Sequence, residues 1–194
     1  GGMPAQCMLL VRKMAEPSPK PERIRSRRRR DVLAELLPSI QGDHVGRDAA
    51  YVRELVETAL KVLRDGTGTG DLKLLNAALR ELRYAFKVFA PYRGVRKVSC
   101  FGSARTPASA PAYKTAKEFS RLIVDRGYMV VTGGGDGIMK ACQEGAGRER
   151  SFGANIRLPF EQEANEFILN DPKLVTFRYF FTRKLIFVKE ADAV

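Results

Sequence analysis

Two short loops hold most of the residues in this chain that could do chemistry. Residues 101–107 read Phe-Gly-Ser-Ala-Arg-Thr-Pro, and residues 132–139 read Thr-Gly-Gly-Gly-Asp-Gly-Ile-Met. Consecutive glycines expose backbone N–H groups and let them approach an anion closely, and a helix that starts after them adds a favourable dipole. We therefore expect these two loops to bind a phosphate group.

The residues without a bulky side chain are the candidates for this role. They are Gly102, Ser103, Gly133, Gly134, Gly135 and Gly137. For Gly135 and Gly137 an alternative stays open, in which glycine only allows tight packing of a strand against a helix. We interpret Asp136 as a helix cap and not as a base, because a carboxylate that faced a bound phosphate would repel it.

Several common sites are excluded by pattern and composition. The dinucleotide fingerprint Gly-x-Gly-x-x-Gly fails, because counting from Gly133 places Ile138 where the last glycine belongs, and no P-loop pattern occurs. Three cysteines and a single histidine, His44, argue against a disulfide framework, the common Cys/His zinc sites and a histidine-based triad. We expect no cofactor and no metal.

Strands and helices alternate from about residue 95 onward. Strands are predicted over 95–101, 128–132, 152–158 and 174–177, and helices over 111–126, 137–147 and 179–189. This alternation predicts an α/β fold with a parallel sheet and helices on both faces, and both loops then lie at the carboxyl ends of strands. A further strand opens at 191–194, so we expect the chain to stop before the last strands of the sheet.

The positive charge of the chain is concentrated near its start. The net charge is +12, and residues 11–30 alone carry nine basic and two acidic side chains. Three prolines lie within 17–21, so a regular helix is excluded there. We predict a flexible basic tail over residues 1–30, and we expect nucleic acid to bind, if anywhere, only through this tail.

The residues between the tail and the first strand look helical. Apolar side chains recur at spacings of three and four from Asp48 to Leu63 and from Asp71 to Phe89. We assign residues 31–94 to a helical extension that serves as an appendage or a dimer surface, and residues 95–194 to a nucleotide-binding domain. We expect a homodimer. No apolar stretch reaches the length of a membrane span, so we expect a cytoplasmic protein without a membrane partner.

Four motifs in residues 95–194 resemble the LOG (Lonely Guy) family, whose members are often mislabelled lysine decarboxylases. The similarity covers residues 100–107, 131–139 with Ala141 and 145–146, 158–162, and 177–184, and it continues through 191–193. The resemblance implies a Rossmann-like fold. It also implies a phosphoribohydrolase, which releases a free base from a nucleoside 5′-monophosphate such as AMP or a cytokinin nucleotide.

The resemblance also implies roles for individual residues. The family's Arg-Lys pair falls on Arg183 and Lys184, which would bind substrate, with Arg183 catalytically important. A substrate-contacting acidic residue would fall near Glu161. The family's next motif, a Pro-Gly-Gly-x-Gly-Thr-x-x-Glu loop that supplies a catalytic glutamate, would follow Val194, so we expect the 194-residue chain alone to be inactive or nearly so.

Two other function classes compete with a hydrolase. One is a non-catalytic carrier, as in molybdenum-cofactor carrier proteins, which resemble the LOG family but hold a pterin phosphate without cutting it. The other is a Rossmann domain that binds single-stranded DNA, which has a similar first loop. The glutamate after the expected second glycine loop separates hydrolase from carrier. Against the DNA-binding class, Met139 follows Gly137 and Ile138, and the excess charge lies in the tail.

Overall fold

The computed structural model describes residues 47–158 and 163–194, and it divides into two compact units, residues 1–67 and 68–194. In the first unit it describes the helix α3 (Arg47–Arg64). Asp48 in its first turn and Lys61 and Arg64 in its last turn match the polarity of the helix dipole. The predicted basic tail over residues 1–30 lies outside the described residues.

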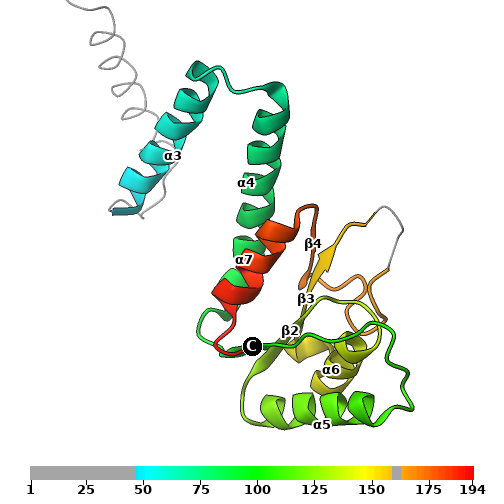
Figure 1. Cartoon of the computed structure of the whole chain (residues 1–194). Coiled ribbons are helices and arrows are strands. Elements are labelled where there is room, and N and C mark those ends of the chain that lie inside the picture. The colour runs from blue at the N-terminus through cyan, green and yellow to red at the C-terminus, as the bar shows by residue number, and fades with distance from the viewer. Residues whose placement is uncertain (1–46, 159–162) are drawn as a thin grey trace, which may run out of the picture. The chain divides into compact units, whose positions relative to one another are not determined.

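The second unit consists of a parallel sheet with helices on both sides (Figure 1). Its elements in chain order are α4 (Thr69–Phe89), η1 (Ala90–Tyr92), β1 (Lys97–Ser99), α5 (Pro111–Asp125), β2 (Met129–Thr132), α6 (Ile138–Ala146), η2 (Arg148–Arg150), β3 (Ser151–Ile156), β4 (Leu174–Phe177) and α7 (Phe180–Glu190). The four strands pair in the order β1-β2-β3-β4, all parallel. The predicted α/β, Rossmann-like class is confirmed.

After α7 the chain returns to the sheet beside β1, on the side opposite to β2. Ala193 forms a parallel bridge with Val98, on the side of β1 that faces away from β2. The Ser99 N–H donates to the Ala193 carbonyl at 2.9 Å, while the next residue, Cys100, donates to Val131 of β2 at 2.9 Å. The strand predicted over 191–194 is thus a single bridge in this structure. The chain segments after β1 and β2 lie at the carboxyl edge, where open parallel sheets bind ligands.

One face of the sheet is covered by α5 and α6. Val130 of β2 forms a core cluster there with Cys142 and Ala146 of α6, and Cys100 packs against the cluster. Gly145 lets the two helices approach closely, because a Cβ at this position would collide with the backbone carbonyl of Lys117. Cys142 is buried and Cys100 is partly buried in this cluster, so both cysteines belong to the core.

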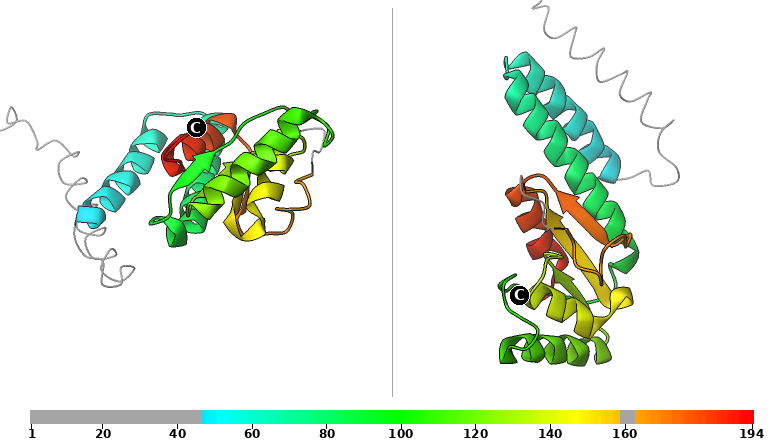
Figure 2. Two further views of the ribbon diagram at one scale, coloured as in Figure 1. Left: turned by 90° about the horizontal axis from the view of Figure 1, so that it is seen from below. Right: turned by 90° about the vertical axis from the view of Figure 1, so that its right-hand side faces the viewer.

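The opposite face is covered by α4 and α7 (Figure 2). The ring of Phe89 at the end of α4 stacks on Phe152 of β3 with 4.2 Å between centroids, and Ile186 and Phe187 of α7 lie in the same core cluster. Ala85 of α4 is completely buried. Helix α4 therefore belongs to the core of the sheet, although it precedes the alternation of strands and helices.

No helix among residues 47–158 and 163–194 is long and apolar enough to cross a membrane.

Candidate functional site

The two loops predicted to bind phosphate meet at the carboxyl ends of β1 and β2. Gly137 has a φ of 63°, and a Cβ on it would collide with the carbonyl oxygen of Ser103. That carbonyl accepts a hydrogen bond from the Ile138 N–H, the first amide of α6, at 3.0 Å. Gly102 packs in the same place, because a Cβ there would collide with the Ile138 side chain. Glycine is therefore required sterically where the loops meet.

The third component is Arg183, which reaches this loop from α7. Its Nε donates to the Ala154 carbonyl of β3 at 2.7 Å, and its Nη2 occupies the space that a Cβ on Gly133 would need. The guanidinium also lies 5.4 Å from the centroid of the Phe187 ring. The structure thus brings together a motif residue of α7 and the glycine loop, which are 50 residues apart in the chain.

The electrostatics of Arg183 are those of an anion-binding group. Burial lowers the pKa of its guanidinium, but an arginine with a reduced pKa still carries its charge at neutral pH. In the part of the chain that the structure describes, no carboxylate lies within ion-pair distance of Arg183. A partly buried positive charge without a counter-charge stabilises a bound oxyanion.

The glycine loop adds backbone donors beside this charge. Among residues 47–158 and 163–194, the N–H groups of Gly135, Asp136 and Gly137 find no hydrogen-bond acceptor. They directly precede α6, where the helix dipole favours negative charge. Asp136 is exposed, whereas the glycines on either side are buried. These donors and Arg183 are suited to hold a phosphate.

Asn165 holds the glycine loop in place, and the sequence analysis did not find it. Its Nδ2 donates to the carbonyls of Gly134 at 3.1 Å and Gly135 at 2.8 Å, and to Gln143 Oε1 at 2.6 Å. Its backbone N–H donates to the Gly134 carbonyl at 2.8 Å. The side chain is 4 % exposed. No periodic pattern surrounds Asn165, so nothing in the sequence singles it out.

Glu81 of α4 was also missed, although the sequence contains a signal. Its two carboxylate oxygens accept hydrogen bonds from the Arg178 backbone N–H at 2.9 Å and from Thr182 Oγ1 at 2.6 Å. It thereby ties α4 to the start of α7, the helix that carries Arg183. Glu81 lies three residues after Ala78 and four before Ala85, both buried, so an acidic residue on this apolar face is the signal.

The remaining predicted residues contribute less or cannot be placed. Ser103 is exposed, and its Oγ accepts from the Arg105 N–H at 3.1 Å. Lys184 is exposed and makes no hydrogen bond or ion pair within the described ranges. Glu161 lies outside the described residues. Within these ranges, no group of three or more His, Cys, Asp or Glu residues could hold a metal ion.

Comparison with known families identifies the family of the chain. The model of the SLOG cluster4 family matches residues 95–194, just over half of the chain. The chain belongs to the SLOG cluster4 family. The SLOG superfamily includes LOG-like Rossmann proteins, so the resemblance seen in the sequence is confirmed at that level, and membership indicates a nucleotide-related function. No curated protein matches the chain.

The family match covers only part of the residues described at this site. The glycine loop, Asn165 and Arg183 lie inside the matched region, whereas Glu81 lies outside it. The part of α4 that contacts the start of α7 is therefore an addition to the region that the family model covers.

Proposed function

We propose that this SLOG cluster4 protein is a nucleoside 5′-monophosphate phosphoribohydrolase, which hydrolyses the N-glycosidic bond of AMP-like or cytokinin nucleotides to a free base and ribose 5-phosphate. One observation carries the proposal. The guanidinium of Arg183 is partly buried, has no carboxylate partner among the described residues, and lies against Gly133 in a loop with unpaired backbone N–H groups.

The binding step follows from this arrangement. The phosphate of the nucleotide accepts hydrogen bonds from the N–H groups of Gly135 and Gly137, next to the first turn of α6. Arg183 offers a planar fork of donors, which fixes the orientation of an oxyanion better than a point charge does. Lys184, on the same helix, adds positive charge that attracts the substrate.

The chemical step needs a carboxylate. Breaking the bond between ribose and base builds positive charge on the sugar, and a carboxylate near the anomeric carbon stabilises that charge. Glu161 is the candidate within this sequence, and the LOG resemblance adds a glutamate that would follow residue 194. Arg183 contributes by holding the phosphate end, so that the anomeric carbon is kept at a fixed position.

A binding experiment on the 194-residue chain tests the phosphate site. We expect Gly134→Asp to abolish calorimetric binding of AMP, because a Cβ at this positive-φ position would face Ile168 and Leu174, so the loop must change its shape to accommodate a buried carboxylate. Gly127→Asp is the matched control, since Gly127 also has a positive φ (84°) but lies in a turn where a Cβ meets nothing within 4 Å. Equal AMP affinity of the two variants would remove the site from the glycine loop.

An activity experiment tests the reaction. Release of free base is followed chromatographically with AMP as substrate and adenosine as the control that lacks a phosphate. We expect release from AMP only, and only in a protein that continues past Val194 into the glutamate loop. AMP binding without release in that longer protein would favour the carrier class over the hydrolase.

A further inference from the structure

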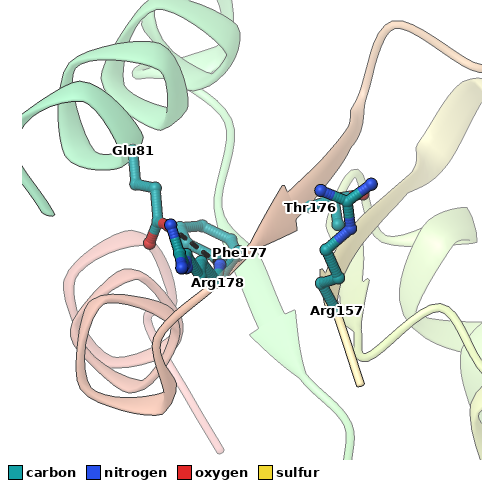
Figure 3. A pocket seen from close by; sticks show the side chains of 5 residues that line it. All are labelled: Glu81, Arg157, Thr176, Phe177 and Arg178. Carbon is teal, nitrogen blue, oxygen red and sulfur yellow. Dashed lines mark hydrogen bonds between the residues drawn. The ribbon is translucent and has the colours of Figure 1, made fainter. Parts of the chain in front are cut away.

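A pocket opens at the carboxyl ends of β3 and β4, on the other half of the sheet edge from the glycine loop. It has a volume of about 680 Å³ and is lined by Glu81, Arg157, Thr176, Phe177 and Arg178. This volume is within the range of small-molecule sites, roughly 300–1,000 Å³. Figure 3 shows Arg157 and Thr176 on one side of β4, with Arg178 and Glu81 on the other. None of the five is a predicted site residue, although Phe177 and Arg178 begin the motif 177–184 that also contains Arg183.

The two arginines lie just beyond the ends of two paired strands. Ile156 and Phe177 are the last paired residues of β3 and β4, and the N–H of Arg157 donates to the Phe177 carbonyl at 2.8 Å. Arg157 and Arg178 directly follow these two residues, and their side chains line the pocket from the two sides of β4 (Figure 3).

Neither guanidinium is neutralised within the described residues. Glu81 lies closest in the pocket, but its oxygens accept from the Arg178 backbone N–H and from Thr182, and no ion pair joins Glu81 to the Arg178 side chain. Glu163 lines a neighbouring cavity of about 260 Å³ together with Arg157, and these two residues form no ion pair either. The pocket therefore keeps a net positive charge.

This pocket is distinct from the site of the proposed function. The glycine loop follows β2 and contacts β1, whereas the pocket follows β3 and β4. Strands of a sheet lie roughly 4.8 Å apart, so β2 and β4 are separated by about 10 Å. The donors also differ, because the glycine loop uses backbone N–H groups while the pocket uses exposed side chains.

We propose that this pocket is a second oxyanion-binding site, which takes the phosphate group of a phosphorylated small molecule between Arg157 and Arg178. Paired guanidinium forks bind phosphate through several charge-assisted hydrogen bonds. The hydroxyl of Thr176, which is exposed beside Arg157, supplies a neutral donor. The rest of the volume accommodates the body of the ligand. The proposal does not depend on hydrolase activity.

The test uses inorganic phosphate as the probe and the 194-residue chain as the protein. Phosphate is titrated by calorimetry and by NMR of the arginine Nε–H groups, at constant ionic strength. The test variant is Arg157→Gln with Arg178→Gln. The matched control is Arg93→Gln with Arg126→Gln, two exposed arginines that precede β1 and β2 at the opposite edge of the sheet.

We expect the test variant to bind phosphate at the pocket at least about tenfold more weakly, and the control variant to bind as the parent does. The Nε–H signals of Arg157 and Arg178 should also shift with phosphate in Gly134→Asp, in which the glycine loop is blocked. Parent-like affinity of the test variant, or an equal loss in the control variant, would overturn the proposal. Loss of the arginine shifts in Gly134→Asp would overturn the separateness of the two sites.

Discussion

The two halves of the sheet edge offer positive charge in different ways. At the ends of β1 and β2, backbone N–H groups lie beside the partly buried Arg183 in a tightly packed loop, the glycine cradle, where a Cβ on Gly133 would collide with Arg183 and one on Gly137 with the Ser103 carbonyl. At the ends of β3 and β4, Arg157 and Arg178 are exposed and line an open pocket. A site built from backbone N–H groups is preorganised, and substitution of its glycines blocks it. A site built from exposed side chains tolerates substitution better, but its flexible groups must be ordered when a ligand binds.

Removing one arginine from each half tests this comparison most directly. In a protein that contains the complete active site, we expect Arg183→Ala to lower kcat for AMP by about 10²-fold or more, the scale of losing one preorganised charged group. Arg183→Lys should recover little of the lost rate, since an ammonium cannot form the planar fork. Arg178→Ala should change kcat by less than about threefold. Steady-state kinetics of base release measure all three, and equal effects of Arg183→Ala and Arg178→Ala would erase the distinction between the halves.

A second prediction concerns what keeps the cradle rigid. Asn165→Ala removes the buried amide that holds Gly134 and Gly135, so we expect a loss of roughly 2–3 kcal/mol in the free energy of unfolding. AMP binding should weaken as well, because the loop loses its fixed geometry. Urea denaturation and calorimetry measure the two effects. Asn76→Ala, at an exposed position of α4, is the control. Unchanged AMP affinity in Asn165→Ala would show that the loop is held by other contacts.

The open half is tested through Glu81. Glu81→Ala removes two hydrogen bonds at the start of α7, and we expect a loss of about 1–2 kcal/mol in the free energy of unfolding. The control Glu149→Ala, at an exposed carboxylate, should change stability by less than about 0.5 kcal/mol. Glu81→Gln should strengthen phosphate binding in the pocket, because it removes a negative charge there. Weaker phosphate binding by Glu81→Gln would contradict the charge assignment.

The smallest expected effect lies in the helices behind the cradle. Burial, and then a 2.8 Å hydrogen bond to Glu144, raises the pKa of Tyr113 to about 12 from its ordinary value of 10. Because the folded state favours the protonated phenol, this contribution to stability is fully present below about pH 10 and is lost as the pH rises towards 12. Absorbance titration at alkaline pH should show a late-titrating tyrosine that Tyr113→Phe removes. If the Tyr113→Phe variant still showed every titration step of the parent, the assignment would be wrong.

The sequence was most informative where chemistry depends on the backbone. Gly133 to Gly137 were recognised because a run of glycines has few explanations other than close approach or unusual φ values, and the structure shows both. The strand predicted over 174–177 coincides with β4 (Leu174–Phe177). The helix predicted over 179–189 differs from α7 (Phe180–Glu190) by one residue at each end. Alternating apolar strands and amphipathic helices were likewise sufficient for the fold class.

The sequence was least informative where partners come from distant segments. Glu81 and Thr182 are 101 residues apart, and Asn165 and Gly134 are 31 apart, so no local spacing links them. Arg157 and Arg178 follow the last paired residues of β3 and β4, so the register of these two strands brings both arginines to one pocket. Sites that are built from side chains of different strands can be found only once the pairing of those strands is known.

The sequence by itself determined the α/β class and singled out the glycine loop and Arg183 as candidates, because each depends on residue type and short spacing. The tertiary structure alone decided that α4 is part of the core and that its Glu81 accepts hydrogen bonds from the start of α7. It also decided that Arg183 lies against Gly133 and that two arginines share one pocket. The physical reason is that hydrophobic burial acts without regard to distance along the chain, so the side chains brought together at the sheet edge follow from packing and register.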